Sequence, residues 1–225
     1  MTATLQRQPR LLSIEGGEGA GKSTVLSALR EALLADGHEV VSTREPGGTP
    51  LAEKIRALML DNRQSLRGEG DEDEPLCAEA ELLLAFAARA QHVRQVVRPA
   101  LQRGAFVVSD RFTDSSYAYQ GDGRGLDPAW IAALERRAVG LRPGLTLLLD
   151  LDVREGRART SGRDLWPDRI ESEQDDFFER VRAGFRRRAA AEPERFRVID
   201  AALPPREVGM AVAAAVEQWL ESPPR

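Results

Sequence analysis

The sequence is poor in cysteine, histidine and aromatic residues. Its 225 residues include one cysteine, Cys77, and two histidines, and aromatic residues make up only 5% of the chain. A single cysteine excludes a disulfide framework within the chain and a cysteine-rich metal site. No apolar run approaches the roughly 18 residues that a membrane-spanning helix needs. The sequence therefore predicts neither a disulfide-stabilised scaffold nor a membrane partner.

The charges nearly balance, with 32 Lys and Arg against 36 Asp and Glu and a net charge of −4. Such a chain has no overall positive field that would attract nucleic acid, so we expect no nucleic-acid partner. The opening residues, MTATLQRQPR, lack the apolar core of a signal peptide. We expect residues 1–10 to form a disordered tail and the protein to be cytoplasmic.

Short apolar runs alternate with helical patterns along the chain. The runs predict strands at 11–15, 38–44, 105–110, 145–153 and 195–200. Several are apolar at consecutive positions, as strands buried on both faces are. Helical spacing of apolar residues occurs at 22–36, 50–61, 75–102 (where Pro99 could end the helix), 127–140, 172–191 and 204–220. The alternation predicts an α/β fold in which helices cover both faces of a parallel sheet.

The segment IEGGEGAGKST (14–24) follows the first predicted strand and fits the pattern G-x-x-x-x-G-K-[ST] without a mismatch. Glycines let successive backbone N–H groups turn towards a phosphate. Lys22 can reach the β- and γ-phosphates of a nucleotide, and the Ser23 hydroxyl can bind Mg²⁺. The following helix would direct the positive end of its dipole at the anion. The residues predicted to bind ATP are Gly16, Gly17, Glu18, Gly19, Ala20, Gly21, Lys22, Ser23 and Thr24.

Proteins with such a phosphate loop include GTPases and small transferases. The stretch DGRG (122–125) matches the D-x-x-G switch of GTPases, but it does not directly follow a strand. The base-reading motif N-K-x-D is absent from the sequence. A small transferase with two nucleotide sites fits the chain better.

Charged residues stand at the ends of two further predicted strands. Asp110 could hold Mg²⁺ or its water shell, and the fork of Arg111 could bind a second phosphate. Arg44 and Glu45 end the strand before a Pro-Gly-Gly turn, at the sheet edge where ligands bind in open α/β folds.

Two helical or loop segments could complete a nucleotide site. Phe86 and Arg89 are three residues apart on one helix, so they share a face and could hold a base by stacking and hydrogen bonding. The arginine-rich segment 154–171 contains helix breakers and could close over polyphosphate as a lid.

Taken together, the motifs resemble those of thymidylate kinases, the ATP-dependent dTMP kinases. The matching pieces are IEGGEGAGKST, TREPGGT, AFAARAQ, SDRFTDSSYAYQGDGRG, LDLDV and DRIESEQDDFFERVRAGF, in the order that the family has them. The resemblance implies the P-loop nucleoside monophosphate kinase fold, with a five-stranded parallel sheet, helices on both faces and an arginine-rich lid. It also implies a single domain over residues 11–221, a homodimer, and phosphorylation of dTMP to dTDP with ATP and Mg²⁺ in support of dTTP synthesis.

The resemblance also implies roles for individual residues. Those assigned to catalysis are Lys22, Asp110, Arg111, Arg159 and Arg163. Those assigned to dTMP binding are Glu45, Pro46, Arg56, Phe86, Arg89, Arg111, Ser115, Tyr119 and Gln120. Ser23 and Asp110 would hold Mg²⁺, with Asp110 acting directly or through water. The peptide bond between Glu45 and Pro46 matches a position where the family uses a cis bond.

The family comes in two arrangements, with an arginine either inside the phosphate loop or in the lid, and this chain also departs from the family pattern at one position. The phosphate loop has no arginine, whereas the predicted lid carries Arg157, Arg159, Arg163 and Arg169, so the chain resembles members with a lid arginine. The family usually has a base-stacking aromatic four residues before the AAR arginine, and here that position is Ala85. Either the neighbouring Phe86 takes the stacking role or another residue does.

Two other functions stay open on the sequence alone. One is a kinase for another nucleoside monophosphate, which would share the phosphate loop and the lid. The other is a nucleotide-binding protein without catalytic activity, which would bind ATP but form no ADP.

Overall fold

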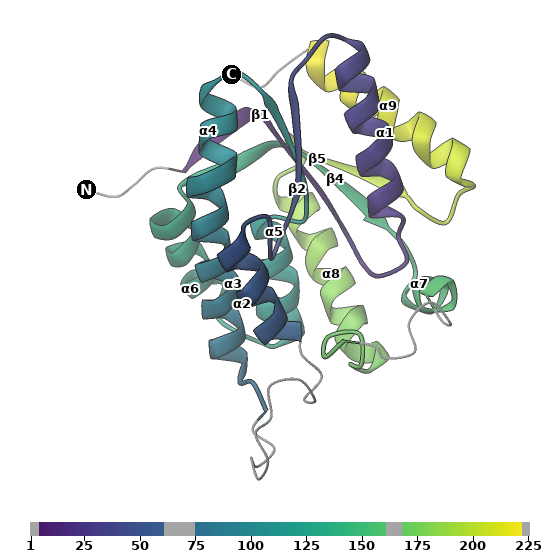
Figure 1. Cartoon of the computed structure of the whole chain (residues 1–225). Helices are drawn as coiled ribbons and strands as arrows, with labels where there is room; N and C mark the ends of the chain where they lie inside the picture. The colour runs from purple at the N-terminus through teal and green to yellow at the C-terminus, as the bar shows by residue number, and fades with distance from the viewer. Residues whose placement is uncertain (1–4, 61–74, 161–167, 222–225) are drawn as a thin grey trace.

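A five-stranded, fully parallel sheet forms the centre of the computed structural model, which describes residues 5–60, 75–160 and 168–221 (Figure 1). The strand order is β2-β3-β1-β4-β5. The strands are β1 (Gln6–Gly16), β2 (Val40–Arg44), β3 (Phe106–Asp110), β4 (Leu141–Asp150) and β5 (Phe196–Asp200). The central strand β1 pairs with β3 and β4, with Ile14 opposite Asp110 and Gly16 opposite Leu149. The predicted parallel sheet is confirmed.

Helices connect the strands in the order that the apolar spacing predicts. The longer helices are α1 (Lys22–Ala35), α2 (Pro50–Leu60), α3 (Ala78–His92), α6 (Pro128–Leu134), α7 (Val153–Thr160), α8 (Asp175–Ala191) and α9 (Pro205–Glu221). The shorter segments are the π-helical η1 (Val93–Val97), η2 (Tyr117–Gly123) and η3 (Glu135–Val139), and the helices α4 (Arg98–Gln102) and α5 (Thr113–Ser116). None of the helices in the described ranges is both long and apolar enough to cross a membrane.

The core is divided by the sheet. On one face, α1 and α9 pack over Leu12, Ile14 and Leu147, and Trp219 of α9 is buried in the same cluster. On the other face, α3, η1, α4 and α6 surround Leu11 and other buried apolar residues, and α8 packs against η2. Figure 1 shows α1 and α9 together on one side of the sheet and α3, α4 and α6 on the other. Burial on both faces explains the continuous apolar runs of the central strands.

The structure departs from the sequence pattern at three places. The predicted tail 1–10 overlaps β1, which begins at Gln6 because Gln6 and Arg7 pair with Leu141 and Arg142 at the start of β4. Pro99 does not end the helical segment, since η1 runs directly into α4 and Pro99 is the second residue of α4. The segment 113–123 forms α5 and η2, although its Gly and Ser content gives no helical pattern.

Candidate active site

Two adjoining pockets open at the carboxyl ends of the strands. The larger has a volume of about 830 Å³ and is lined by the 16–24 loop, β4, α7 and α8. The smaller has a volume of about 90 Å³ and is lined by α2, α3, η2 and the turn 168–171. Both pockets are lined by Glu18, Glu45, Arg56, Arg111 and Glu171. Two ligands could therefore meet across a shared boundary.

The phosphate loop has a backbone that side chains would obstruct. Gly16, Gly19 and Gly21 have φ values of 144°, 70° and 86°, a region that favours glycine. A Cβ on Gly16 would lie 2.5 Å from the carbonyl oxygen of Leu149 on the adjacent strand, and one on Gly19 would meet Gly156 of α7. The glycines thus allow the loop to pass close to β4 and to the first turns of α7.

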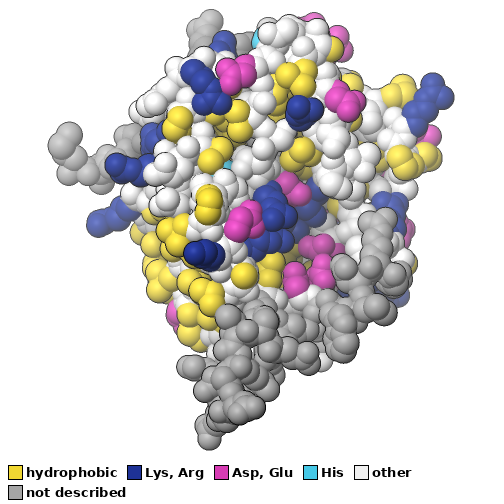
Figure 2. Space-filling view, viewed as in Figure 1, with side chains coloured by type: hydrophobic (Ala, Val, Ile, Leu, Met, Phe, Trp, Pro, Cys, Tyr) yellow, Lys and Arg dark blue, Asp and Glu magenta, His cyan; other side chains and the backbone are white. Residues whose placement is uncertain are grey.

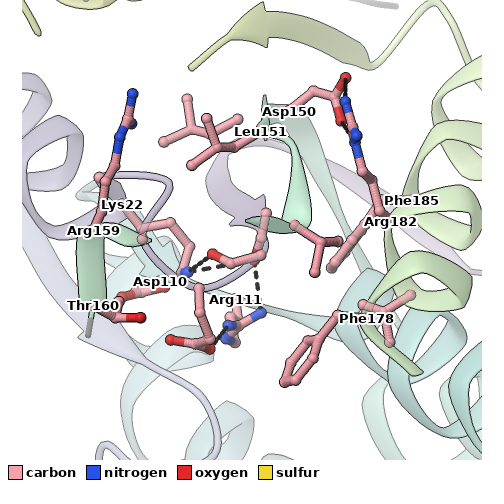
Figure 3. A pocket seen from close by; sticks show the side chains of 18 of the residues that line it. Lys22, Asp110, Arg111, Asp150, Leu151, Arg159, Thr160, Phe178, Arg182 and Phe185 are labelled. Atoms are coloured by element: carbon pink, nitrogen blue, oxygen red, sulfur yellow. Dashed lines mark hydrogen bonds and ion pairs between the residues drawn. The ribbon is translucent and has the colours of Figure 1, made fainter. Parts of the chain in front are cut away.

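Lys22 begins α1 and turns its side chain back over the loop (Figure 3). Its Nζ donates to the carbonyl oxygens of Gly17 at 2.7 Å and Gly16 at 3.3 Å. Burial, together with the positive charge of Arg111, lowers the pKa of Lys22 to about 8. Glu18, Asp110 and Glu15 offset this effect only in part, so an anionic ligand would further stabilise the ammonium.

Arg111 links the phosphate loop to the second pocket. Its φ is 67°, an unusual value for a residue other than glycine, and its backbone N–H donates to the carbonyl oxygen of Ile14 at 2.9 Å. The guanidinium donates to the carbonyl oxygen of Gly16 at 3.1 Å and to Glu18 Oε1 at 3.0 Å, and it lies 4.9 Å from the centre of the Tyr119 ring. Burial alone would raise the pKa of Glu18, but Arg111 and Lys22 hold it below its ordinary value.

Asp110 ends β3 beside Lys22 (Figure 3). Its Oδ1 is buried and has no hydrogen-bond partner among the residues that the structure describes. A buried carboxylate oxygen without a partner is costly unless a ligand or ion completes it. Ser23, the other predicted metal-binding residue, lines the same pocket.

Glu15 is a buried residue of the site that the sequence motifs did not single out. It accepts hydrogen bonds from the backbone N–H of Phe112 at 2.7 Å and from Ser115 Oγ at 2.6 Å. Burial, followed by the negative charge of Asp114, raises the pKa of Glu15 to about 8. Glu15 thereby holds the backbone immediately after Arg111. A charged residue inside an apolar strand, LLSIE, is the signal that could have identified it.

Positive charge gathers where the pockets meet. Arg56 donates to the carbonyl oxygen of Pro46 at 3.1 Å, and its pKa is lowered by burial and then by the charges of Arg44 and Arg111. Figure 2 shows Lys and Arg side chains together in a central hollow of this face. Cations that repel one another in a hollow are suited to bind phosphate groups.

The smaller pocket contains the predicted base-binding arginine. Arg89 is 3% exposed and donates to Glu45 Oε2 at 2.5 Å, to Ser116 Oγ at 3.0 Å and to the carbonyl oxygen of Phe112 at 3.2 Å. Glu45 also accepts from His92 Nδ1 at 2.8 Å. The Glu45–Pro46 bond is cis, as the family pattern indicated. Since a guanidinium has five N–H donors and these bonds use three, Arg89 retains donors for a ligand.

Phe86 does not line the smaller pocket. It is buried in the core on α3, and the Arg89 guanidinium carbon lies 4.7 Å from the centre of its ring. The two residues share a helix face as their spacing predicts, but the Phe86 ring contacts the Arg89 guanidinium from the core side and does not face the pocket. At this turn the pocket wall is formed by Ala85. Four other predicted residues, Pro46, Ser115, Tyr119 and Gln120, do line the smaller pocket.

The predicted lid, 154–171, is only partly a loop. Residues 154–160 belong to α7, and Arg163 lies outside the described residues. Arg159 lines the larger pocket, but its Nη1 donates to the carbonyl oxygen of Ala201 at 2.8 Å. Arg157 forms an ion pair with Asp175 at 2.8 Å. Within the part of the chain that the structure describes, neither guanidinium bonds to the phosphate loop.

Comparisons with known proteins agree with these features. A family model described as thymidylate kinase matches residues 14–212. The chain is 51% identical to a thymidylate kinase of Alkalilimnicola ehrlichii over 216 residues, covering 94% of this chain and 95% of that protein. It is 53% identical to one of Pseudomonas fluorescens over 211 residues, covering 93% and 96%.

A solved structure is also similar. The crystal structure of thymidylate kinase from Ehrlichia chaffeensis matches with a TM-score of 0.69 and 30% identity, covering 94% of this chain and 99% of that one. The sequence family, the near-complete coverage and the fold coincide with a phosphate loop and two adjoining pockets. This chain belongs to the thymidylate kinase family.

Proposed function

We propose that this chain transfers the γ-phosphoryl group of ATP to the 5′-phosphate of dTMP, giving ADP and dTDP for dTTP synthesis. The observation that carries the proposal is the position of Arg111. It lies on the boundary of the two pockets and bonds to the phosphate loop at Gly16. A guanidinium there can contact phosphates of both substrates. The reaction would take place in a single domain over 11–221, with 154–171 as its lid.

The larger pocket would hold ATP along the residues of the 16–24 loop, and the smaller pocket would hold dTMP. In the smaller pocket, Arg56 and Arg111 would bind the monophosphate, while Arg89 and Gln120 would face the base. Met59 and Ile170 add apolar surface to this wall. Ser115 and Tyr119 line the same pocket between the two ends.

Mg²⁺ fits the donors at the phosphate loop. Ser23 and Asp110 would hold it, directly or through water, and the unpartnered Asp110 Oδ1 supports this assignment. Among the described residues no cluster of three or more His, Cys, Asp or Glu could enclose a metal, which suits an ion that keeps waters and phosphate oxygens as ligands. When bound, Mg²⁺ neutralises charge on the phosphates.

The transfer needs no strong general base, because the acceptor oxygen of dTMP is already ionised at neutral pH. The protein must instead bring two anions together and stabilise the charge of the transferring group. Lys22 and Arg111, which both bond to the carbonyl oxygen of Gly16, supply positive charge at the loop, and a lid arginine, Arg159 or Arg163, would add to it. Exclusion of water around the bound substrates would strengthen each of these contacts.

The test is ADP production from Mg·ATP with dTMP, dUMP, dCMP, AMP or GMP supplied separately. We expect strong turnover with dTMP and weaker turnover with dUMP, since one methyl group is worth only about 1–3 kcal/mol. The Lys22→Ala variant serves as the control and should turn over at least ~100-fold more slowly. Preference for another monophosphate, or ATP binding without ADP formation, would contradict the proposal.

A homodimer belongs to the same proposal and is supported by an apolar face. α2 packs against α3, and Leu51, Leu58 and Leu83 on these helices are each about half exposed. Figure 2 shows hydrophobic side chains along this side of the molecule. Sedimentation of the wild type against a Leu58→Glu variant tests this, because a charge there should shift the species towards monomer. A cytoplasmic location would follow from the nucleotide substrates.

A further inference from the structure

The fully buried carboxylate of Glu81, in the first turn of α3, joins three segments of the chain. Its Oε1 accepts a hydrogen bond from Gln120 Nε2 at 2.7 Å. Its Oε2 accepts from Arg124 Nε at 3.2 Å and from Arg169 Nη2 at 2.5 Å. A buried carboxylate that loses a partner is destabilising, so the three donors should keep these positions around Glu81.

Two of the three groups bound to Glu81, Gln120 and Arg169, belong to segments that form walls of the smaller pocket. Gln120 lines it directly. Arg169 lies within the turn 168–171, whose other members Asp168, Ile170 and Glu171 all line it. Arg169 also connects that turn to the end of α2, since its Nε donates to the carbonyl oxygen of Met59 at 2.9 Å. One carboxylate thus fixes α3, η2 and the 168–171 turn relative to one another.

Glu81 also determines which way the Gln120 amide faces. An ionised carboxylate only accepts hydrogen bonds, so the amide nitrogen of Gln120 must point towards it. The other branch of the amide is then the oxygen, an acceptor. An acceptor complements the ring N–H of thymine or uracil, whereas cytosine has an acceptor at the same ring position.

We propose that Glu81 is a positioning residue for the monophosphate: it assembles the base pocket and sets the Gln120 amide to accept from a pyrimidine ring N–H. The inference rests on the proposed function. Glu81 itself is sealed behind Gln120 and Arg169 and does not line either pocket. Its effect should therefore fall on dTMP and leave ATP binding nearly unchanged.

The matched control is Glu135, a second fully buried glutamate. It accepts from Arg142 Nη2 at 2.9 Å and from the Tyr117 hydroxyl at 3.0 Å, and it lines neither pocket. Glu81→Gln and Glu135→Gln remove the same charge from similar surroundings. A role that is only structural would affect the two variants alike.

The experiment compares the Michaelis constants for dTMP and ATP, the turnover of dTMP against dCMP, and the melting temperature. Glu81→Gln should raise the KM for dTMP about 10-fold or more, as expected for a lost charged hydrogen bond, with the KM for ATP changed less than twofold. Its preference for dTMP over dCMP should fall. Glu135→Gln should lower the melting temperature without changing either KM.

Equal changes in both Michaelis constants, or an unchanged KM for dTMP, would overturn the role of Glu81. If Glu81→Gln does not fold, Arg169→Gln removes one donor and leaves the pair with Arg124, and it should also raise the KM for dTMP selectively. Wild-type enzyme that fails to phosphorylate dTMP would overturn the proposed function and this inference together, whereas active wild type with unaffected variants would overturn the inference alone.

Discussion

Arg111 and Glu18 form an ion pair, with Nη2 and Oε1 3.0 Å apart, at the boundary that the two pockets share. The pair joins the residue after β3 to the phosphate loop. Because Arg111 also bonds to Gly16, its guanidinium is held in one orientation before any ligand arrives. Such preorganisation is what transfer between two anions requires.

Replacing Arg111 by lysine should lower kcat/KM for dTMP by about 10- to 100-fold, because lysine keeps the charge but loses the planar fork. Steady-state kinetics measure this. Arg103→Lys is the control, since Arg103 is exposed and pairs with Glu39 at 2.7 Å away from the pockets. Similar rates for the Arg111→Lys variant and the wild type would contradict a bidentate role.

ATP binding should take up a proton above pH 8. Burial and Arg111 hold the pKa of Lys22 at about 8, below its ordinary 10.5, so the free enzyme increasingly carries a neutral lysine as the pH rises. A triphosphate beside Lys22 would favour the ammonium and raise its pKa again. Calorimetry at pH 9 in two buffers of different ionisation enthalpy, with ATP and no dTMP, should therefore show proton uptake.

The control for this linkage is Lys22→Arg, because arginine stays protonated throughout the range. Its ATP binding should show no proton uptake at pH 9. Equal uptake by the wild type and by this variant would assign the proton to a group other than Lys22.

Glu15 should make the folded protein less stable as the pH rises from about 4.5 to about 8. Its pKa is raised from the ordinary 4.5 to about 8 by burial and by Asp114, so within this window the folded chain binds a proton that the unfolded chain has lost. Stability therefore falls through the window and levels off above it. The loss should be on the order of a few kcal/mol, at about 1.4 kcal/mol per pKa unit.

The measurement is the free energy of unfolding by denaturant at pH 5, 7 and 9 for the wild type and for Glu15→Gln. The amide is neutral at every pH and can still accept from the Phe112 N–H. The stability of the wild type relative to the variant should decline between pH 5 and pH 9. A constant difference across this range would mean that Glu15 does not change protonation.

Replacing the two arginines of the proposed lid should change different kinetic constants. Arg159 donates to the carbonyl oxygen of Ala201 beside the larger pocket, so Arg159→Ala should raise the KM for ATP more than the KM for dTMP. Arg163→Ala should lower kcat more than it weakens dTMP binding, by about 10-fold or more if its guanidinium meets the transferring group. Loss of dTMP affinity alone in Arg163→Ala would show that the lid assignment is wrong.

Much of the fold follows from local pattern. The central strands are buried on both faces, so their apolar runs are visible in the sequence, and amphipathic spacing identified α1, α8 and α9 within a residue or a few of their bounds. The start of β1 and the segment α5–η2 were not predicted. Gln6 and Arg7 are polar and extend only because β4 offers a paired edge, while the 113–123 segment is helical because it packs against α8.

By itself, the sequence determined the phosphate loop, the order of strands and helices, and the residues at the strand ends, since each depends on neighbours close in the chain. The tertiary structure alone decided which side chains face the ligands. In the folded chain, Phe86 lies in the core and Ala85 lies on the pocket wall. Glu81 bonds to Gln120 and Arg169, which are 39 and 88 positions away in the sequence. The physical reason is that burial and ion pairing depend on distance in space, which spacing along one helix or strand does not determine.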